Sequence, residues 1–156
     1  LHGGGQERGL RPGTEDVASA VAFAVAAEVA EAEREEVMAR IGAMRDALEA
    51  GLCERIPGLR INAAGAPRLP TISNLSVPGA DPEMLLMALD MEGIAASSGS
   101  ACSSGAVEPS HVLLAMGLPA EIAGPSVRFS LGRDTTQSDI GRVLEVFPRV
   151  VERVRV

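Results

Sequence analysis

The chain has 156 residues, of which 46% are hydrophobic and 22% are charged, a balance that suits one globular domain with its own core. The formal net charge of -7 argues against direct binding of nucleic acid, because neutralising phosphates requires a basic surface. All 14 basic residues are arginine, so no lysine of this chain can form a Schiff base with a cofactor.

The cysteines and histidines exclude two further classes of protein. Cys53 and Cys102 form no spaced framework, which argues against a disulfide scaffold and predicts a reducing, cytoplasmic environment. The two histidines and two cysteines show none of the paired spacing of zinc sites, so we expect no metal site. No apolar run has the length of a membrane span and no leader opens the chain, so we expect no membrane partner. Because the chain opens in the middle of a motif, we expect it to be a piece of a longer protein.

Residues 1–14 form a glycine-rich segment that is unsuited to a helix or a central strand. Successive glycines expose backbone N–H groups, and Arg8 and Arg11 add positive charge. The segment is therefore suited to bind an anion such as phosphate. The same glycines are equally typical of a tight structural connection, and the residues alone leave both interpretations open.

A long helix is predicted after this segment. Thr14 is suited to the N-cap position, and apolar residues then recur at intervals of three and four, with charged residues on the opposite face. The pattern predicts one helix that ends near Gly51, or two helices with a break near Gly42. Cys53 lies beside apolar residues at the end of this pattern, which favours a core position.

Shorter elements follow in the middle of the chain. Residues 71–77 are rich in β-prone side chains and predict a strand. Asp81 is suited to cap a second helix, with Pro82 at its first position and Gly93 closing it. Residues 94–97 predict a short strand that runs into a segment rich in serine and glycine.

Cys102 lies in that segment, residues 97–105, among five serines and two glycines. No packing argument places a cysteine among such small, flexible residues, so the composition favours a reactive and mobile thiol over a chance cysteine in a linker. Ser110 is predicted to cap a short helix. His111, directly after this cap, is favoured as a surface or cap residue over a catalytic base.

The last part of the chain predicts a strand and a helix. Residues 126–131 alternate in polarity, which turns Arg128 away from the core. Arg128 is suited to bind a carboxylate, although a lone strand arginine is more often simply solvated. Thr136 and Asp139 form a predicted capping pair for a final helix, which Pro148 should kink or interrupt. The elements together predict an α+β fold, in which helices cover one face of a small, mostly antiparallel sheet.

Three segments of the chain resemble the cysteine desulfurases of the NifS and IscS type: residues 2–17, 97–113 and 126–132. The resemblance implies the small C-terminal domain of a fold type I transferase that depends on pyridoxal 5'-phosphate (PLP). It implies that residues 1–14 end a cofactor domain absent from this chain. Residues 15–156 then comprise a long linking helix and the small domain, with the mobile cysteine loop at 97–105.

The resemblance also assigns roles to three residues. Cys102 matches the nucleophile that attacks the sulfur of L-cysteine and leaves L-alanine and an enzyme persulfide. Thr14 matches the threonine that reaches the PLP phosphate of the other subunit, and Arg128 matches the arginine that holds the substrate carboxylate. The Schiff-base lysine is absent, so we expect this chain alone to be inactive and to hold no PLP covalently.

The resemblance further implies a homodimer and a protein that accepts sulfur, such as an iron–sulfur scaffold, in iron–sulfur cluster, thio-cofactor or tRNA biosynthesis. Two alternatives stay open. One is a non-enzymatic module that binds a sulfur acceptor or a partner chain, and the other is a PLP enzyme similar to selenocysteine lyase.

Overall fold

The structure is a computed structural model in which residues 2–98 and 108–155 are described. The chain divides into two compact units, Leu1–Glu36 and Val37–Val156. Helix α1, Val17–Arg55, belongs to both units. Cys102 and the rest of residues 99–105 lie outside the described residues.

The first unit contains a short 3-10 turn, η1 (Glu7–Gly9), and the beginning of α1. Asp16 caps α1, because its carboxylate accepts hydrogen bonds from the backbone N–H of Ser19 at 3.1 Å and from the Ser19 hydroxyl at 2.6 Å. The bond from the Ser19 hydroxyl is the main reason that the pKa of Asp16 is lowered. The prediction that Thr14 caps the helix is therefore wrong, since the carboxylate directly before Val17 takes this role.

The second unit is built on one four-stranded antiparallel sheet. Its strands, in the order β1-β2-β4-β3, are β1 (Arg60–Ile61), β2 (Ile72–Ser76), β4 (Ser126–Ser130) and β3 (Ser97–Ser98). The last strand of the chain is thus central, between β2 and β3. The predicted strands at 71–77 and 126–131 are confirmed to within one residue at each end. The strand predicted at 94–97 is wrong, because only its final residue enters β3.

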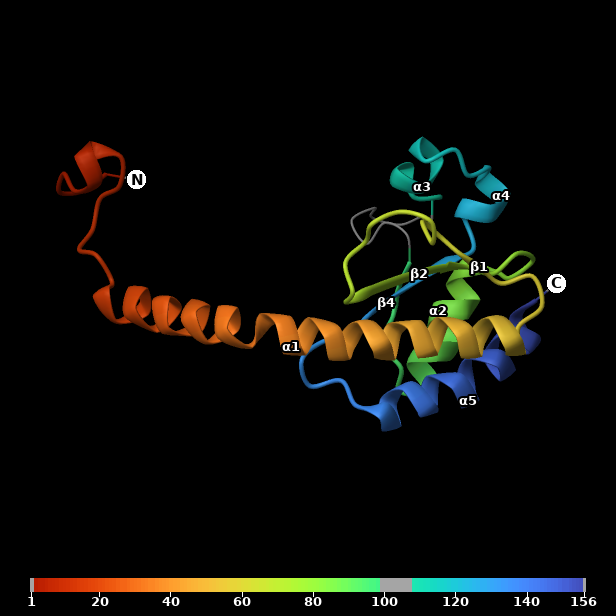
Figure 1. The fold of residues 1–156 in the computed structure, drawn as a ribbon. Coiled ribbons are helices and arrows are strands. Elements are labelled where there is room, and N and C mark those ends of the chain that lie inside the picture. Colours follow the sequence, from red (N-terminus) through yellow and green to blue (C-terminus); the bar gives the residue numbers. More distant parts are fainter. Residues whose placement is uncertain (1, 99–107, 156) are drawn as a thin grey trace. The chain divides into compact units, whose positions relative to one another are not determined.

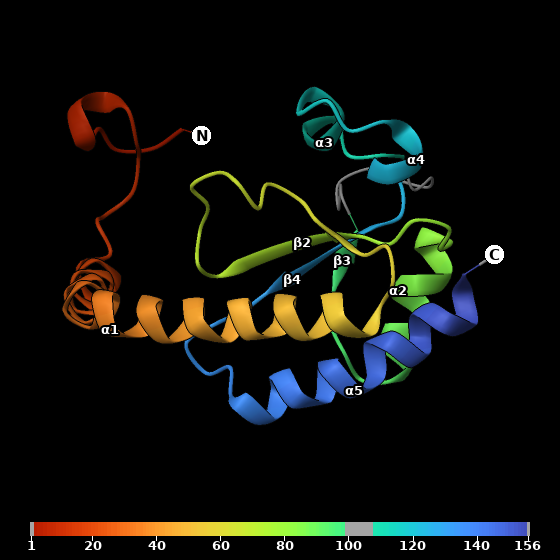
Figure 2. The same ribbon diagram turned by 45° about the vertical axis from the view of Figure 1, so that its right-hand side comes forward.

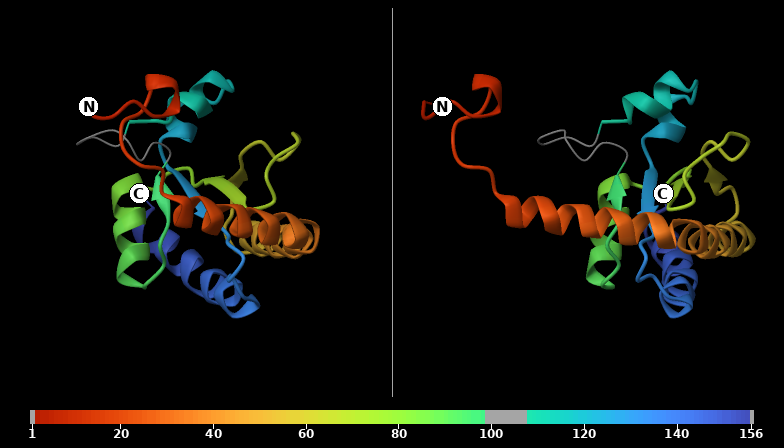
Figure 3. Two further views of the ribbon diagram at one scale, coloured as in Figure 1. Left: turned by 90° about the vertical axis from the view of Figure 1, so that its left-hand side faces the viewer. Right: turned by 60° about the vertical axis from the view of Figure 1, so that its left-hand side comes forward.

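The helices of the second unit cover one face of this sheet. The part of α1 that belongs to this unit lies there with α2 (Pro82–Met91) and α5 (Gln137–Val154) (Figures 1 and 2). Two short helices, α3 (His111–Ala115) and α4 (Ala120–Ala123), lie beyond the start of β4 (Figure 3). The predicted α+β fold, with helices on one face of a small antiparallel sheet, is confirmed.

Alternation along the strands decides which side chains enter the core. Leu75, Val127 and Phe129 are buried against the helices. The Phe129 ring meets the Phe147 ring of α5 edge to face, with ring centroids 5.4 Å apart. The opposite face of the sheet is consequently left to the polar residues of β2 and β4.

Helix α1 is continuous, so the alternative with a break near Gly42 is wrong. Its buried large apolar residues in the second unit recur every three or four positions, from Ile41 to Leu48 and Leu52. Cys53 is one residue out of phase with this stripe and is exposed. The prediction that Cys53 belongs to the core is therefore wrong, because helical phase outweighs apolar neighbours in the sequence.

Helix α5 begins as predicted, at a capping box in which the Thr136 hydroxyl accepts from the Asp139 N–H and the Asp139 carboxylate accepts from the Thr136 N–H. The helix then continues through Pro148 to Val154. Of the two predicted effects of Pro148, a kink or an interruption, the interruption is therefore wrong. Phe147 and Val150, on either side of the proline, are buried, and this packing holds the helix together across it.

Candidate functional site

Arg128 lies at the centre of the sheet face that the helices leave open. It pairs with Asn74 of β2 on one side and with Ser97 of β3 on the other. Val127 and Phe129 point into the core, so Arg128 points away from it and is exposed, as predicted. Within residues 2–98 and 108–155, its guanidinium has no hydrogen bond or ion pair. Its donors are therefore available for an anionic ligand.

A network of amide and hydroxyl groups lies beside Arg128 on the same face. The Asn62 side chain is only 3% exposed. Its Nδ2 donates to Asn74 Oδ1 at 2.6 Å and to Ser76 Oγ at 2.8 Å. Sequence reasoning missed this network because Asn62 and Asn74 become neighbours only when the chain folds back into β2.

The segment that carries Cys102 starts at the same place. Ser97 and Ser98, the first residues of the predicted cysteine loop, form β3 and pair with Arg128 and Val127. Cys102 follows Ser97 by five residues in the sequence but lies outside the described residues. The structure thus brings the start of the cysteine segment next to Arg128.

Thr14 is in the first unit, after a tightly turned segment. A β-bridge joins Gln6 to Arg11, and the backbone between them has the left-handed conformation at Glu7 and Arg8. Arg8, Arg11 and Thr14 are all exposed. This arrangement leaves the two guanidinium groups and the threonine hydroxyl accessible to an anion.

The second cysteine, Cys53, is disfavoured as a nucleophile. Partial burial of the thiol and, to a lesser extent, the nearby Glu49 carboxylate raise its pKa. A raised pKa lowers the fraction of thiolate at neutral pH, and the thiolate is the reactive form. Exposure of Cys53 therefore does not make it a candidate for the reactive thiol.

The chain offers only part of a PLP site. It contains no lysine, so it lacks a Schiff-base partner for the cofactor. The exposed hydroxyl of Thr14 fits a phosphate, and the guanidinium of Arg128, which has no partner among the described residues, fits a carboxylate. Across the described ranges no cluster of three or more His, Cys, Asp or Glu side chains could hold a metal ion.

Comparison with known families identifies the wider group. The profile of the family described as Aminotransferase class-V matches residues 4–143. The chain belongs to the class-V aminotransferase family. The predicted resemblance to this family is thereby confirmed.

Several relatives of this class-V aminotransferase chain are named cysteine desulfurases. It is 47% identical over 155 residues to "Cysteine desulfurase 2" of Trichormus variabilis. It is 46% identical over 156 residues to "IscS-like cysteine desulfurase" of Mycobacterium tuberculosis. Each alignment covers 99% of this chain but only 39% or 40% of the relative. The chain thus spans about two fifths of the length of these curated relatives.

Solved structures give the same result for the fold. The NifS-like protein from Rickettsia africae matches with a TM-score of 0.82 at 31% identity, over 97% of this chain and 39% of that one. A second NifS-like protein matches with a TM-score of 0.80 at 31% identity, over 99% of this chain and 39% of that one. The predicted small domain of a PLP-dependent fold is therefore confirmed.

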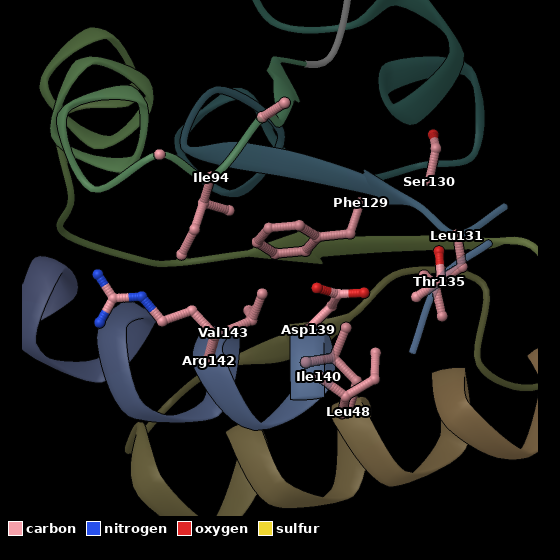
Figure 4. Close-up of a pocket in the computed structure, with 12 residues that line it drawn as sticks. Leu48, Ile94, Phe129, Ser130, Leu131, Thr135, Asp139, Ile140, Arg142 and Val143 are labelled. Atoms are coloured by element: carbon pink, nitrogen blue, oxygen red, sulfur yellow. The ribbon is translucent and has the colours of Figure 1, made fainter. Parts of the chain in front are cut away.

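A pocket of about 240 Å³ lies on the other side of β4 from Arg128, between residues 93–95 and the start of α5. Phe129 and Ile140 contribute apolar walls, and the Asp139 carboxylate points into the space between them (Figure 4). The pocket contains none of the predicted site residues. We therefore place the candidate site on the open face of the sheet.

None of the helices within residues 2–98 and 108–155 combines the length and the apolar character that crossing a bilayer requires.

Proposed function

We propose that this chain is the C-terminal part of a PLP-dependent cysteine desulfurase, which converts L-cysteine to L-alanine and leaves a persulfide on Cys102. One observation carries the proposal: Arg128 lies at the centre of the open sheet face with no side-chain partner among residues 2–98 and 108–155, and its backbone pairs across the strands with Ser97, where the cysteine segment begins. The relatives named cysteine desulfurase, 44–47% identical over 99% of the chain, support it.

Arg128 binds the carboxylate of the substrate in this proposal. A guanidinium holds a carboxylate through two parallel N–H···O bonds, which fixes the orientation of the amino acid as well as its position. The strands on both sides of β4 hold Arg128 in place, so the carboxylate is held by a rigid element. The sulfur atom of the substrate is then directed to one location for attack.

Cys102 supplies the attacking sulfur. Its thiolate forms an S–S bond to the sulfur of L-cysteine while the Cβ–S bond of the substrate breaks. The electron pair of that bond stays with Cβ, and a proton then completes the methyl group of alanine. PLP, when bound, supplies the electron sink for this cleavage. A thiol on a serine- and glycine-rich segment is suited to move afterwards towards a protein that accepts the sulfur. We propose that this acceptor is an iron–sulfur scaffold protein.

Thr14 contributes to the cofactor site of a second subunit. Its hydroxyl donates to the PLP phosphate of the partner in a homodimer, and the neighbouring Arg8 and Arg11 make the segment favourable for an anion. The remaining part of the polypeptide provides the Schiff-base lysine. The chain alone is accordingly inactive, and the complete enzyme acts in the cytoplasm.

The test uses the complete polypeptide that contains this chain. Cys102→Ala should abolish persulfide and alanine formation while the absorbance of bound PLP stays unchanged. Cys53→Ala is the matched control and should keep normal activity, because the thiol of Cys53 has a raised pKa. Alanine formation at the normal rate by Cys102→Ala would reject the proposed function.

A further inference from the structure

A second hydrogen-bond donor lies beside Arg128 on the open face of the sheet. Asn74 of β2 directly opposes Arg128 of β4 in the antiparallel register. Opposed residues have Cβ atoms about 4.5–5.5 Å apart and direct their side chains to the same face. β2 and β4 run side by side in Figures 1 and 2. The Asn74 amide is thus within reach of a small group that binds the Arg128 guanidinium.

Asn62 determines which end of the Asn74 amide is presented. The Nδ2 group of Asn62 donates both to Asn74 Oδ1 and to Ser76 Oγ, which uses both of its hydrogens. In the structure Asn74 thus presents its oxygen to Asn62, and its own Nδ2 group is the other end of the same amide. Among the residues that the structure describes, Asn74 Nδ2 donates to none.

The surroundings of Asn62 hold this arrangement in place. The backbone N–H of Asn62 donates to the carbonyl oxygen of Asn74 at 2.9 Å. Ser76 is fully buried and pairs across the sheet with Ser126, which is 1% exposed. Because Asn62 is itself buried, its side chain cannot turn to solvent without losing both of its bonds. The donor on Asn74 is therefore preorganised.

We propose that Asn74 is a further binding residue for the substrate carboxylate, to which its Nδ2 group donates, and that Asn62 is a positioning residue that fixes Asn74 as a donor. The inference rests on the proposed function, because it requires that Arg128 binds this carboxylate. An ionised carboxylate has about four lone-pair sites, so a bidentate guanidinium leaves acceptor sites for Asn74. The pair of donors selects amino acids over simple amines.

Affinity measurements on the complete enzyme test this role. Asn74→Ala should raise the dissociation constant of L-cysteine about tenfold, the loss expected for one hydrogen bond to a charged group. The constant is read from the change in absorbance of bound PLP during titration. The dissociation constant of cysteamine, which lacks the carboxylate, should stay unchanged. Ser130→Ala is the matched control, because Ser130 is exposed on the same face of β4.

Two further variants separate binding from folding. Asn74→Asp keeps the shape of the side chain and the acceptor for Asn62, but it places a carboxylate beside Arg128. It should weaken L-cysteine binding more than Asn74→Ala does, since the new charge competes for the guanidinium. Asn62→Ala should weaken L-cysteine binding less than Asn74→Ala, and the double variant should be no weaker than Asn74→Ala alone.

The outcomes distinguish this inference from the proposed function. If Arg128→Ala weakens L-cysteine binding but Asn74→Ala does not, the role of Asn74 is rejected and that of Arg128 stands. If Asn74→Ala weakens cysteamine and L-cysteine equally, Asn74 acts on the fold and not on the carboxylate, which also rejects the inference. If Arg128→Ala leaves L-cysteine affinity unchanged, the carboxylate site itself is wrong.

Discussion

Glu49 and Arg68 form a bidentate ion pair, with Nη1–Oε1 and Nη2–Oε2 distances of 2.6 and 2.7 Å, in which the Glu49 side chain is only 5% exposed. The hydroxyl of Ser73 on β2 also donates to Glu49 Oε1, at 2.8 Å. One buried carboxylate on α1 thereby connects the helix to β2 and to the segment that precedes it. The bond to Glu49 raises the pKa of Arg68.

Arg68→Ala should lower the free energy of unfolding by about 3 kcal/mol, because it leaves the charge of Glu49 buried without its partner. Urea denaturation of the purified chain measures the change. Arg149→Ala is the control, since the pair that Arg149 forms with Glu145 is exposed at both ends and should contribute little. Equal effects of the two variants would show that burial does not strengthen the Glu49–Arg68 pair.

Cys53 should react slowly with iodoacetamide at neutral pH. Its raised pKa lowers the thiolate fraction, so the midpoint of a plot of alkylation rate against pH should lie above that of an unstructured cysteine peptide. The measurement uses the Cys102→Ala variant, in which Cys53 is the one remaining thiol. A midpoint at or below that of the peptide would contradict this expectation.

The capping box of α5 makes part of the stability dependent on pH. The backbone N–H of Thr136 is the main reason that the pKa of Asp139 is lowered in the folded chain. A lowered pKa gives stability that is present above the unfolded pKa and lost as the pH falls through the folded pKa. Asp139→Asn should therefore reduce the loss of stability between neutral and acidic pH in urea titrations.

Thr136→Ala tests the other half of the box and should cost about 1 kcal/mol of stability at neutral pH, the usual value for an N-cap. Ser138→Ala serves as its control, because Ser138 lies two residues after Thr136 and takes no part in the capping bonds. A loss in Ser138→Ala as large as that in Thr136→Ala would show that the capping bonds are not the cause.

Pro148→Ala should raise the free energy of unfolding by about 1–3 kcal/mol. The helix already continues through this position, so alanine restores a backbone N–H donor and removes a clash with the preceding turn without changing the fold. Thermal and urea unfolding measure the gain. A loss of stability would mean that the proline ring contributes packing that outweighs its backbone cost.

If Thr14 donates to the PLP phosphate as proposed, Thr14→Ala should weaken retention of PLP by the complete enzyme, whereas Thr14→Ser should retain the cofactor. Dialysis followed by the absorbance of bound PLP measures the difference. Unchanged retention in Thr14→Ala would remove Thr14 from the cofactor site while leaving the roles of Cys102 and Arg128 open to their own tests.

Local signals in the sequence predicted those parts of the structure that depend on neighbouring residues. The alternation of polar and apolar residues around Arg128 predicted that its side chain points away from the core. The spacing of Thr136 and Asp139 predicted where α5 begins. The Asn62–Asn74 and Glu49–Arg68 contacts escaped prediction, because the partners are 12 and 19 residues apart and meet only through the register of β2. The apolar neighbours of Cys53 in the sequence predict a core position, but the phase of Cys53 on α1 places it on the exposed side.

The central position of β4 has a consequence for the folding of this domain during its synthesis. Until the polypeptide has been synthesised past Ser130, β2 and β3 have no strand to bridge them, and each keeps an unpaired edge. The sheet is thus completed only after most of the chain has been synthesised. A prematurely terminated product that ends before β4 would leave the inner edges of β2 and β3 unpaired, which favours aggregation.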